Sequence, residues 1–255
     1  MTVPHYFDAS GPIAKTARQV RRYAGEADDL VALDDAVSCC RACPRLVAWR
    51  EQVAETKRAA FTAEEYWGRP IPGMGSADAA IAIVGLAPAA HGGNRTGRVF
   101  TGDRSGDWLF AALYRAGLAN QPTSVSADDG LELIGTRVLA AVRCAPPANK
   151  PTPAERDTCR PWLTRELGLV RPKVIVVLGG FGWAALWAGL ADLGIAAPVP
   201  RPVFGHGAEV HLAEADLTLL GCYHVSQQNT FTGRLTEPML DAVFARAKEL
   251  ADLPP

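Results

Sequence analysis

The chain has 255 residues, of which 48% are hydrophobic, so it can bury one large core. Its 26 basic and 27 acidic residues nearly cancel, which excludes a global positive field for nucleic acid but leaves room for a local basic rim around a site. The N-terminus lacks a basic segment followed by an apolar one, so we expect no secretory signal and a cytoplasmic protein.

The elements expected along the chain alternate between strands and helices. Residues 1–36 carry mixed charge and one weak helical pattern, and residues 56–78, rich in glycine and proline, are typical of a connector. Continuous apolar runs predict strands buried on both faces at 80–84, 137–142, 174–178 and 217–220. Helical spacing of apolar residues is found at 109–116 and 239–250, and a capping box begins another helix at 152–155.

This alternation predicts an α/β fold, a three-layer α/β/α sandwich around a central four-stranded, mainly parallel sheet. We expect one domain over 1–255, made of an N-terminal extension (1–36) and a catalytic core (37–255). The uncharged stretch 174–191 is as long as a membrane span, but Gly179, Gly180 and Gly182 divide it. It therefore predicts a buried strand, turn and helix, and no membrane association.

The cysteines indicate metal or cluster chemistry, because disulfides are rare in a reducing compartment. Cys40 and Cys43 form a C-x-x-C pair, and Cys144 and Cys159 follow far downstream. Because a zinc site usually has two close-spaced pairs, this spacing favours a [4Fe–4S] cluster over zinc and over buried cysteines without a ligand. We expect a structural cluster that ties the N-terminal extension to the loop after the second strand.

Two further cysteines have other expected roles. Cys39 is an alternative to Cys40 as a ligand, although C-x-x-C is the commoner arrangement. Cys222 lies inside the last predicted strand, where a core position is the simplest interpretation.

Polar or glycine-rich loops follow three of the predicted strands, at 85–88, 143–149 and 223–226. Ligands of such α/β folds bind beyond the C-terminal ends of the strands. The three loops are therefore expected to meet at one cleft.

The loops also carry a family resemblance. The segment 85–103, GLAPAAHGGNRTGRVFTGD, resembles the first motif of family-five uracil-DNA glycosylases, the type-b enzymes of bacteria and archaea. The segment 224–229, HVSQQN, is similar to the closing H-x-S motif of the wider superfamily, and the cysteine spacing resembles the cluster arrangement of families four and five. The resemblance covers about residues 38–250. It implies a monofunctional enzyme that hydrolyses the N-glycosidic bond of uracil, and of other deaminated bases, flipped out of DNA, which leaves an abasic site for base excision repair.

The resemblance implies two catalytic residues. Many superfamily members have an acidic or amide residue just after the first glycine of motif one, where this chain has Leu86 and Ala87. The essential acid is then implied to be Asp103, which would stabilise the cationic sugar and orient water; its alternative role is to cap the helix expected near Ser105. His224 resembles the histidine that donates a hydrogen bond to uracil O2; its alternative role is structural.

Other residues are expected to bind the base. The amide of Asn149 suits one edge of uracil, with an asparagine turn as the alternative. Phe100 is expected to stack on the flipped ring, with a core position as the alternative. Backbone amides and close approach are expected from Leu86, Ala87, Gly92 and Gly93.

DNA is the expected partner, bound by a monomer. Arg95, Arg98 and Arg104 either contact phosphates or are solvated charges. The loop carrying Gln227, Asn229 and Arg234 is expected to enter the minor groove and fill the vacated stack.

Two other functions fit the same residues less well. An iron–sulfur electron-transfer or nucleotide-binding α/β protein is suggested by Gly179-Gly180-Phe181-Gly182 after a strand, although the chain has neither G-x-G-x-x-G nor a Walker motif. A non-catalytic binder of damaged DNA is the third possibility.

Overall fold

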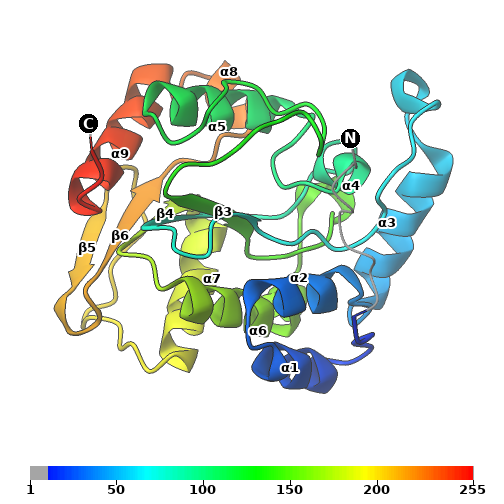
Figure 1. The fold of residues 1–255 in the computed structure, drawn as a ribbon, viewed down its shortest axis with the longest axis horizontal. Coiled ribbons are helices and arrows are strands. Elements are labelled where there is room, and N and C mark those ends of the chain that lie inside the picture. The colour runs from blue at the N-terminus through cyan, green and yellow to red at the C-terminus, as the bar shows by residue number, and fades with distance from the viewer. Residues whose placement is uncertain (1–10, 255) are drawn as a thin grey trace.

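The computed structural model describes residues 11–254, and its centre is a sheet of continuous apolar strands. Four strands are parallel neighbours and are buried along their whole length: β3 (Thr136–Ala140), β2 (Ile81–Gly85), β4 (Val174–Leu178) and β6 (Leu217–Cys222). Two antiparallel strands, β1 (Met74–Gly75) and β5 (Glu209–Leu212), lie at the edges, so the order is β1-β3-β2-β4-β6-β5 (Figure 1).

The four predicted strands thus form the parallel centre of the sheet, but the expected strand number was too low: the described residues form a six-stranded sheet. The edge strands were missed for a physical reason. β1 has only two residues, and β5 is largely exposed, so neither has the continuous apolar run that marks a strand covered on both faces.

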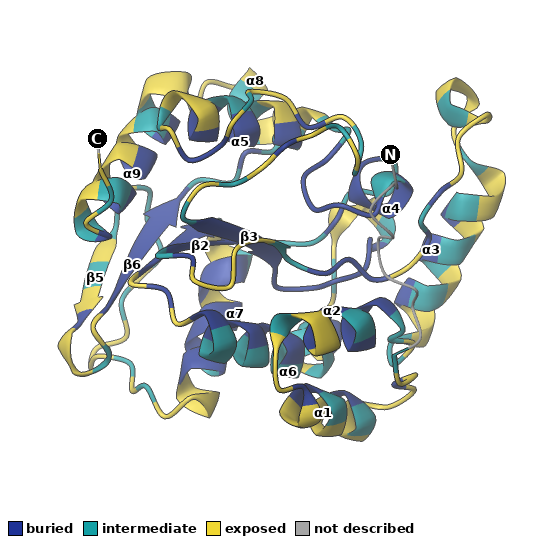
Figure 2. Cartoon of the chain, viewed as in Figure 1, coloured by how far each residue is buried: buried dark blue, intermediate teal, exposed yellow. Residues whose placement is uncertain are grey.

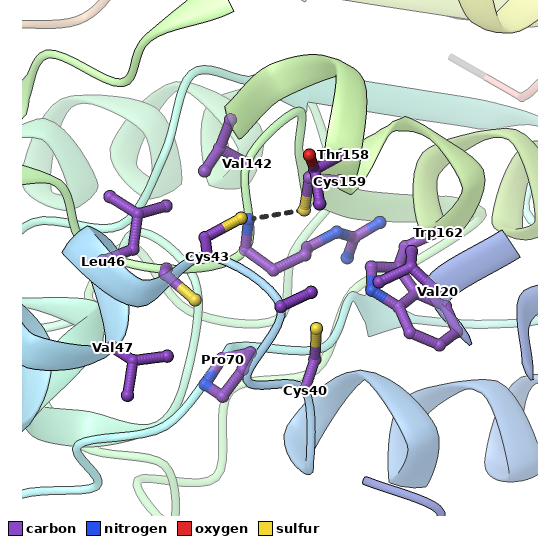
Figure 3. Close-up of a pocket in the computed structure, with 13 residues that line it drawn as sticks. Val20, Cys40, Cys43, Leu46, Val47, Pro70, Val142, Thr158, Cys159 and Trp162 are labelled. Atoms are coloured by element: carbon purple, nitrogen blue, oxygen red, sulfur yellow. Dashed lines mark hydrogen bonds between the residues drawn. The ribbon is translucent and has the colours of Figure 1, made fainter. Parts of the chain in front are cut away.

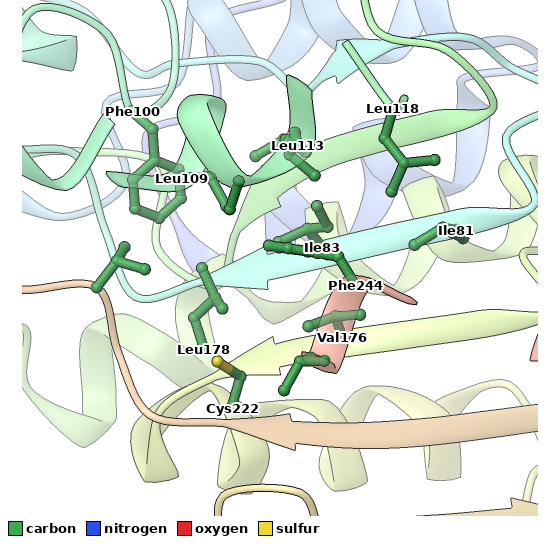
Figure 4. Close-up of a cluster of buried hydrophobic side chains, with 14 of the residues drawn as sticks. Ile81, Ile83, Phe100, Leu109, Leu113, Leu118, Val176, Leu178, Cys222 and Phe244 are labelled. Carbon is green, nitrogen blue, oxygen red and sulfur yellow. The ribbon is translucent and has the colours of Figure 1, made fainter. Parts of the chain in front are cut away.

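Helices cover both faces of the sheet, as the alternating pattern predicted. One face packs against α5 (Arg104–Arg115) and α9 (Glu237–Leu250), where Ile83 and Val176 meet Leu109 and Phe244 (Figure 4). The opposite face packs against α6 (Pro153–Val170) and α7 (Gly180–Asp192). Figure 2 shows the central strands as a buried layer, the edge strand β5 largely exposed, and exposed residues on the outer surfaces of the helices.

Local signals account for where two of these helices begin. The capping box before α6 is present: the Glu155 backbone N–H donates to Thr152 Oγ1 at 3.2 Å, and the Thr152 N–H donates to Glu155 Oε2 at 2.8 Å. Such a cap contributes about 1 kcal/mol. Between β4 and α7, Gly179 adopts a positive φ of 93°, which divides the uncharged stretch as predicted. Among residues 11–254, no helix combines the length and apolarity that crossing a membrane requires.

The N-terminal extension contains more helix than its weak pattern indicated. Helices α1 (Ala17–Glu26) and α2 (Leu30–Ser38) pack on the outer side of α6, around the fully buried Trp162. Helix α3 (Pro44–Thr56) follows, then a 3-10 turn η1 (Ala59–Phe61). The remaining short elements are α4 (Gly93–Thr96), η2 (Pro147–Asn149), η3 (Ala213–Ala215) and α8 (Gln227–Phe231).

Candidate active site and cysteine site

The loops after β2, β3 and β6 meet at one cleft with a volume of about 510 Å³. Asp103, Asn149 and His224, which are far apart in the sequence, all line it. The cleft lies at the C-terminal ends of the parallel strands, where the α/β architecture places ligands. Its other lining residues are Leu86, Ala87, Pro88, Ala89, Val99, Phe100, Arg104, Ser105, Ala148, Lys150, Ser226, Gln227 and Gln228.

Asp103 caps helix α5 and also faces the cleft, so its two expected roles coexist. Its Oδ1 accepts a hydrogen bond of 3.0 Å from the Gly106 backbone N–H. Its Oδ2 lies against Gly92, where a β-carbon would overlap it. Burial raises the pKa of the Asp103 carboxyl above its ordinary value, opposed by backbone hydrogen bonds from Gly106 and Ser105.

His224 presents a neutral imidazole to the cleft. Burial lowers its pKa to about 4, so the ring carries no charge at neutral pH. Its Nε2 is buried without a hydrogen-bond partner among the described residues. The Asn229 side-chain nitrogen donates to the His224 backbone carbonyl at 2.8 Å and fixes the loop behind the ring. Buried polar atoms without a partner are uncommon, and this one belongs to a residue that lines the cleft.

Phe100 is both a core residue and a wall of the cleft. It is 7% exposed, its φ is +52°, and its ring centroid lies 6.2 Å from that of His224. A β-carbon at Gly85 would lie 2.6 Å from the Phe100 ring, so glycine at the end of β2 lets the ring lie over the strand.

Asn149 lies in a strained loop between β3 and α6. It is exposed, and both it and Ala148 have positive φ values, 55° and 53°. Non-glycine residues in this region cost about 1 kcal/mol each, and such strain is found where a fold holds a side chain at a site. Both alternatives expected for Asn149 are therefore compatible with its place in the structure: it lies in a turn, and it lines the cleft.

The two motif glycines lie outside the lining of this cleft, in contrast to the expected contact with substrate. Gly92 makes room for Asp103 and borders a second, adjoining cleft of about 690 Å³. A β-carbon at Gly93 would lie 2.8 Å from Ile71 Cδ1 and 3.1 Å from Pro88 Cβ, so Gly93 permits close packing. Leu86 and Ala87 do line the cleft.

Two of the three arginines expected at phosphates are instead buried. Arg98 is 3% exposed, and its Nη2 donates to both carboxylate oxygens of Asp129 at 2.8 Å. Arg95 forms an ion pair with Glu64 and donates to the His91 carbonyl at 2.9 Å. The expectation of a phosphate contact is therefore wrong for Arg98, and the Arg95 guanidinium is committed within the protein.

Arg104 is the exposed one of these three arginines, and it borders both clefts. On α8 and beyond it, Gln227 also lines both clefts, and Arg234 stacks over the Tyr223 ring at 4.6 Å. Asn229, unlike Gln227 and Arg234, is held within the protein, because its side-chain nitrogen donates a hydrogen bond to the His224 carbonyl.

The second cleft also contains a histidine for which the sequence predicted no role. His91, within motif one, pairs through Nδ1 with the Tyr66 hydroxyl at 3.0 Å and lines this cleft with Arg58 and Phe61. The sequence signal for this histidine is its position within the motif at 85–103.

The four cysteines with the predicted spacing line one small pocket, shown in Figure 3. Cys40 follows α2, Cys43 caps α3, Cys144 lies after β3 and Cys159 is in α6. The other two cysteines, Cys39 and Cys222, lie outside this pocket. Cys39 ends α2 and is not part of the lining, and Cys222 is fully buried in the core at the end of β6.

The surroundings of the pocket suit an anionic group. Burial, with the neighbouring thiols, raises the pKa of Cys43 to about 12, so the thiols are neutral without a bound cation. Two lining residues have buried nitrogen atoms without hydrogen-bond partners among the described residues, namely Arg143 (Nε and Nη1) and Trp162 (Nε1). Arg50, which donates to Cys144 Sγ from beside the pocket, has an unpaired Nε. Within residues 11–254, no group of side chains is close enough to hold a single metal ion. Four cysteine sulfurs with buried N–H groups beside them are the donor chemistry that iron–sulfur clusters use.

Comparisons with known proteins agree with the motifs. The family model "Uracil DNA glycosylase superfamily" matches residues 72–248. A type-5 uracil-DNA glycosylase of Mycobacterium bovis is 57% identical over 232 residues, 90% of this chain and 85% of the relative. Those of Thermus thermophilus and Pyrobaculum aerophilum are 51% and 46% identical and cover 88% and 83% of this chain and 100% and 88% of their own lengths. The chain therefore belongs to the uracil-DNA glycosylase superfamily, among the type-5 enzymes.

Proposed function

We infer that the protein is a DNA repair hydrolase that cleaves the N-glycosidic bond of uracil in DNA and leaves an abasic site. The observation that carries the mechanism is the presence of Asp103 and the neutral His224 in one cleft, beside Phe100 and Asn149. Because a base inside a duplex is unreachable, the target nucleotide rotates out of the stack into this cleft.

The two catalytic groups match the charges that develop during cleavage. Positive charge grows on the sugar, and the Asp103 carboxylate stabilises it and orients the attacking water through Oδ2, because Oδ1 is engaged with Gly106. Negative charge grows on the departing base, and the unpaired Nε2 of His224 donates to uracil O2. A neutral imidazole is a suitable donor here because it carries its proton at neutral pH without a charge to bury.

Other residues of the cleft select and hold the base. Asn149 offers both a donor and an acceptor to one edge of uracil, and Phe100 stacks on its ring. Leu86 and Ala87 leave this part of the cleft apolar, with the backbone available to the base. We propose that this less selective wall admits other deaminated bases, hypoxanthine among them.

Contacts with DNA are assigned to the exposed residues around the cleft. Arg104 contacts a phosphate, and Gln227 and Arg234 belong to the loop that enters the minor groove. Asn229 supports this loop through the His224 carbonyl. We propose that the protein acts as a cytoplasmic monomer with a single catalytic domain.

For the cysteine site, we propose a [4Fe–4S] cluster held by Cys40, Cys43, Cys144 and Cys159. The four positions and the unpaired donors around them support this assignment. When bound, such a cluster cross-links the segment before α3 to the loop after β3 and to α6, and it supplies no chemistry to hydrolysis, which transfers no electrons. Its role is structural.

A cleavage assay tests this function. Purified protein is incubated with a uracil-containing oligonucleotide, and abasic sites are revealed by alkali. We expect cleavage by the wild type and a loss of at least about 100-fold in Asp103→Ala and His224→Ala. Glu26→Ala, which removes an exposed carboxylate of α1 outside both clefts, is the control. A wild-type rate in both cleft variants would refute the mechanism, and no cleavage by cluster-loaded wild type would refute the activity.

A further inference from the structure

Arg50 differs from every other buried arginine among residues 11–254. The five are Arg50, Arg95, Arg98, Arg137 and Arg143. Each of the other four donates a hydrogen bond to a carboxylate, of Glu64, Asp129, Glu166 or Asp34. Arg50 donates instead to a sulfur and a carbonyl: Nη1 to Cys144 Sγ at 2.9 Å and Nη2 to the Cys40 carbonyl at 3.1 Å.

The charge of Arg50 therefore lacks a close counter-ion in the described part of the chain. Arg50 is 1% exposed, and its Nε has no hydrogen-bond partner among the described residues. Its ion pair with the half-exposed Glu51 is long, at 3.9 Å. A buried guanidinium is costly unless an anion compensates it. The nearby Arg143 is different, because it is paired with the buried Glu166.

The cysteine sulfur in direct contact with Arg50 is Cys144 Sγ. The same guanidinium donates to the Cys40 carbonyl, so it links two of the four cysteine positions that line the pocket. Four thiolates around a [4Fe–4S] cluster carry net negative charge, and N–H donors to the sulfurs are among the factors that set the cluster's potential.

We propose that Arg50 is the buried counter-charge of the cluster and donates N–H···S hydrogen bonds to it from the inside of the protein. This inference rests on the proposed cluster at these four cysteines. A positive charge and its hydrogen bonds stabilise the reduced, more negative state of a cluster, and they also hold the oxidised cluster in place.

The test compares cluster-loaded wild type with Arg50→Met, which keeps a similar length but removes the charge and the donors. We expect a downward shift of the cluster's reduction potential in a dye-mediated titration. We also expect the brown absorbance to be lost to an iron chelator about 10-fold to 100-fold faster. Arg22→Met is the matched control, because it removes the same charge from an exposed side chain of α1, the helix whose Val20 lines this pocket.

A second variant decides the outcome if Arg50→Met does not fold. Arg50→Lys keeps the charge but loses the planar fork that reaches Cys144 and Cys40 together. We expect a potential close to that of the wild type and a faster release of iron. Wild-type release from Arg50→Lys, or values in Arg50→Met equal to those of Arg22→Met, would overturn the proposal. Wild-type protein without iron and sulfide would instead refute the cluster itself.

Discussion

Gly92 leaves the space in which Oδ2 of Asp103 lies, because a β-carbon at residue 92 would overlap that oxygen. The other carboxylate oxygen, Oδ1, is engaged with the Gly106 N–H at the start of α5. Motif one thus supplies both the carboxylate and the glycine that receives it.

Gly92→Ala is expected to move the Asp103 carboxylate and to lower kcat on the order of 100-fold, since displacement of a catalytic group by about 1 Å has this effect. Single-turnover cleavage of a uracil-containing oligonucleotide measures it. Gly25→Ala is the control, because a β-carbon there meets nothing within 4 Å. A wild-type rate in Gly92→Ala would mean that Oδ2 does not act.

His224 makes stability depend on pH. Its pKa in the folded protein is lowered to about 4, so between pH 6.5 and 4 the unfolded chain binds a proton that the folded protein does not. Folding stability therefore falls as pH drops through this range, by about 2–3 kcal/mol at pH 4.5. Urea unfolding at pH 7 and pH 4.5 should show that His224→Gln loses less stability than the wild type, and equal losses would contradict the burial of the ring.

Arg98→Met is expected to destabilise the protein rather than to weaken DNA binding. Its guanidinium forms a buried pair with Asp129, and removing one member of such a pair costs about 3–5 kcal/mol. Thermal unfolding and DNA affinity of the folded protein measure the two effects separately. A large loss of affinity with unchanged stability would restore the phosphate contact that the sequence predicted.

Arg104→Ala should have the opposite effect, because this side chain is exposed at the rim of both clefts. We expect unchanged stability, weaker binding to all DNA sequences and a salt dependence of affinity reduced by about one phosphate contact. Binding titrations over a range of salt concentrations measure this slope. An unchanged slope would remove Arg104 from the interface.

Cys159→Ala is expected to lose iron and brown colour, because Cys159 lines the pocket of the four cysteines. Cys39→Ala is the matched control and should keep both, because the chain turns Cys40 and not Cys39 into this pocket. Iron and sulfide analysis of the purified variants distinguishes them. If Cys39→Ala lost the cluster, Cys39 would replace Cys40 as the assigned ligand.

The sequence by itself determined the parallel centre of the sheet, the start of α6 and the family. Each depends on local signals: continuous apolar runs such as 174–178, the capping box Thr152–Glu155, and motifs read in order. A strand buried on both faces and a helix cap are each specified by residues close together in the chain, so the sequence alone is enough to predict them.

Only the tertiary structure decided which polar side chains are free to act. Arg98 and Arg104 are six residues apart, yet Arg98 is buried against Asp129, which lies 31 residues further along the chain, and Arg104 is exposed. Likewise, Arg50 gave no signal in the sequence, because its partner Cys144 is 94 residues away along the chain. Burial and pairing depend on contacts between distant segments, which hydrophobic periodicity does not encode.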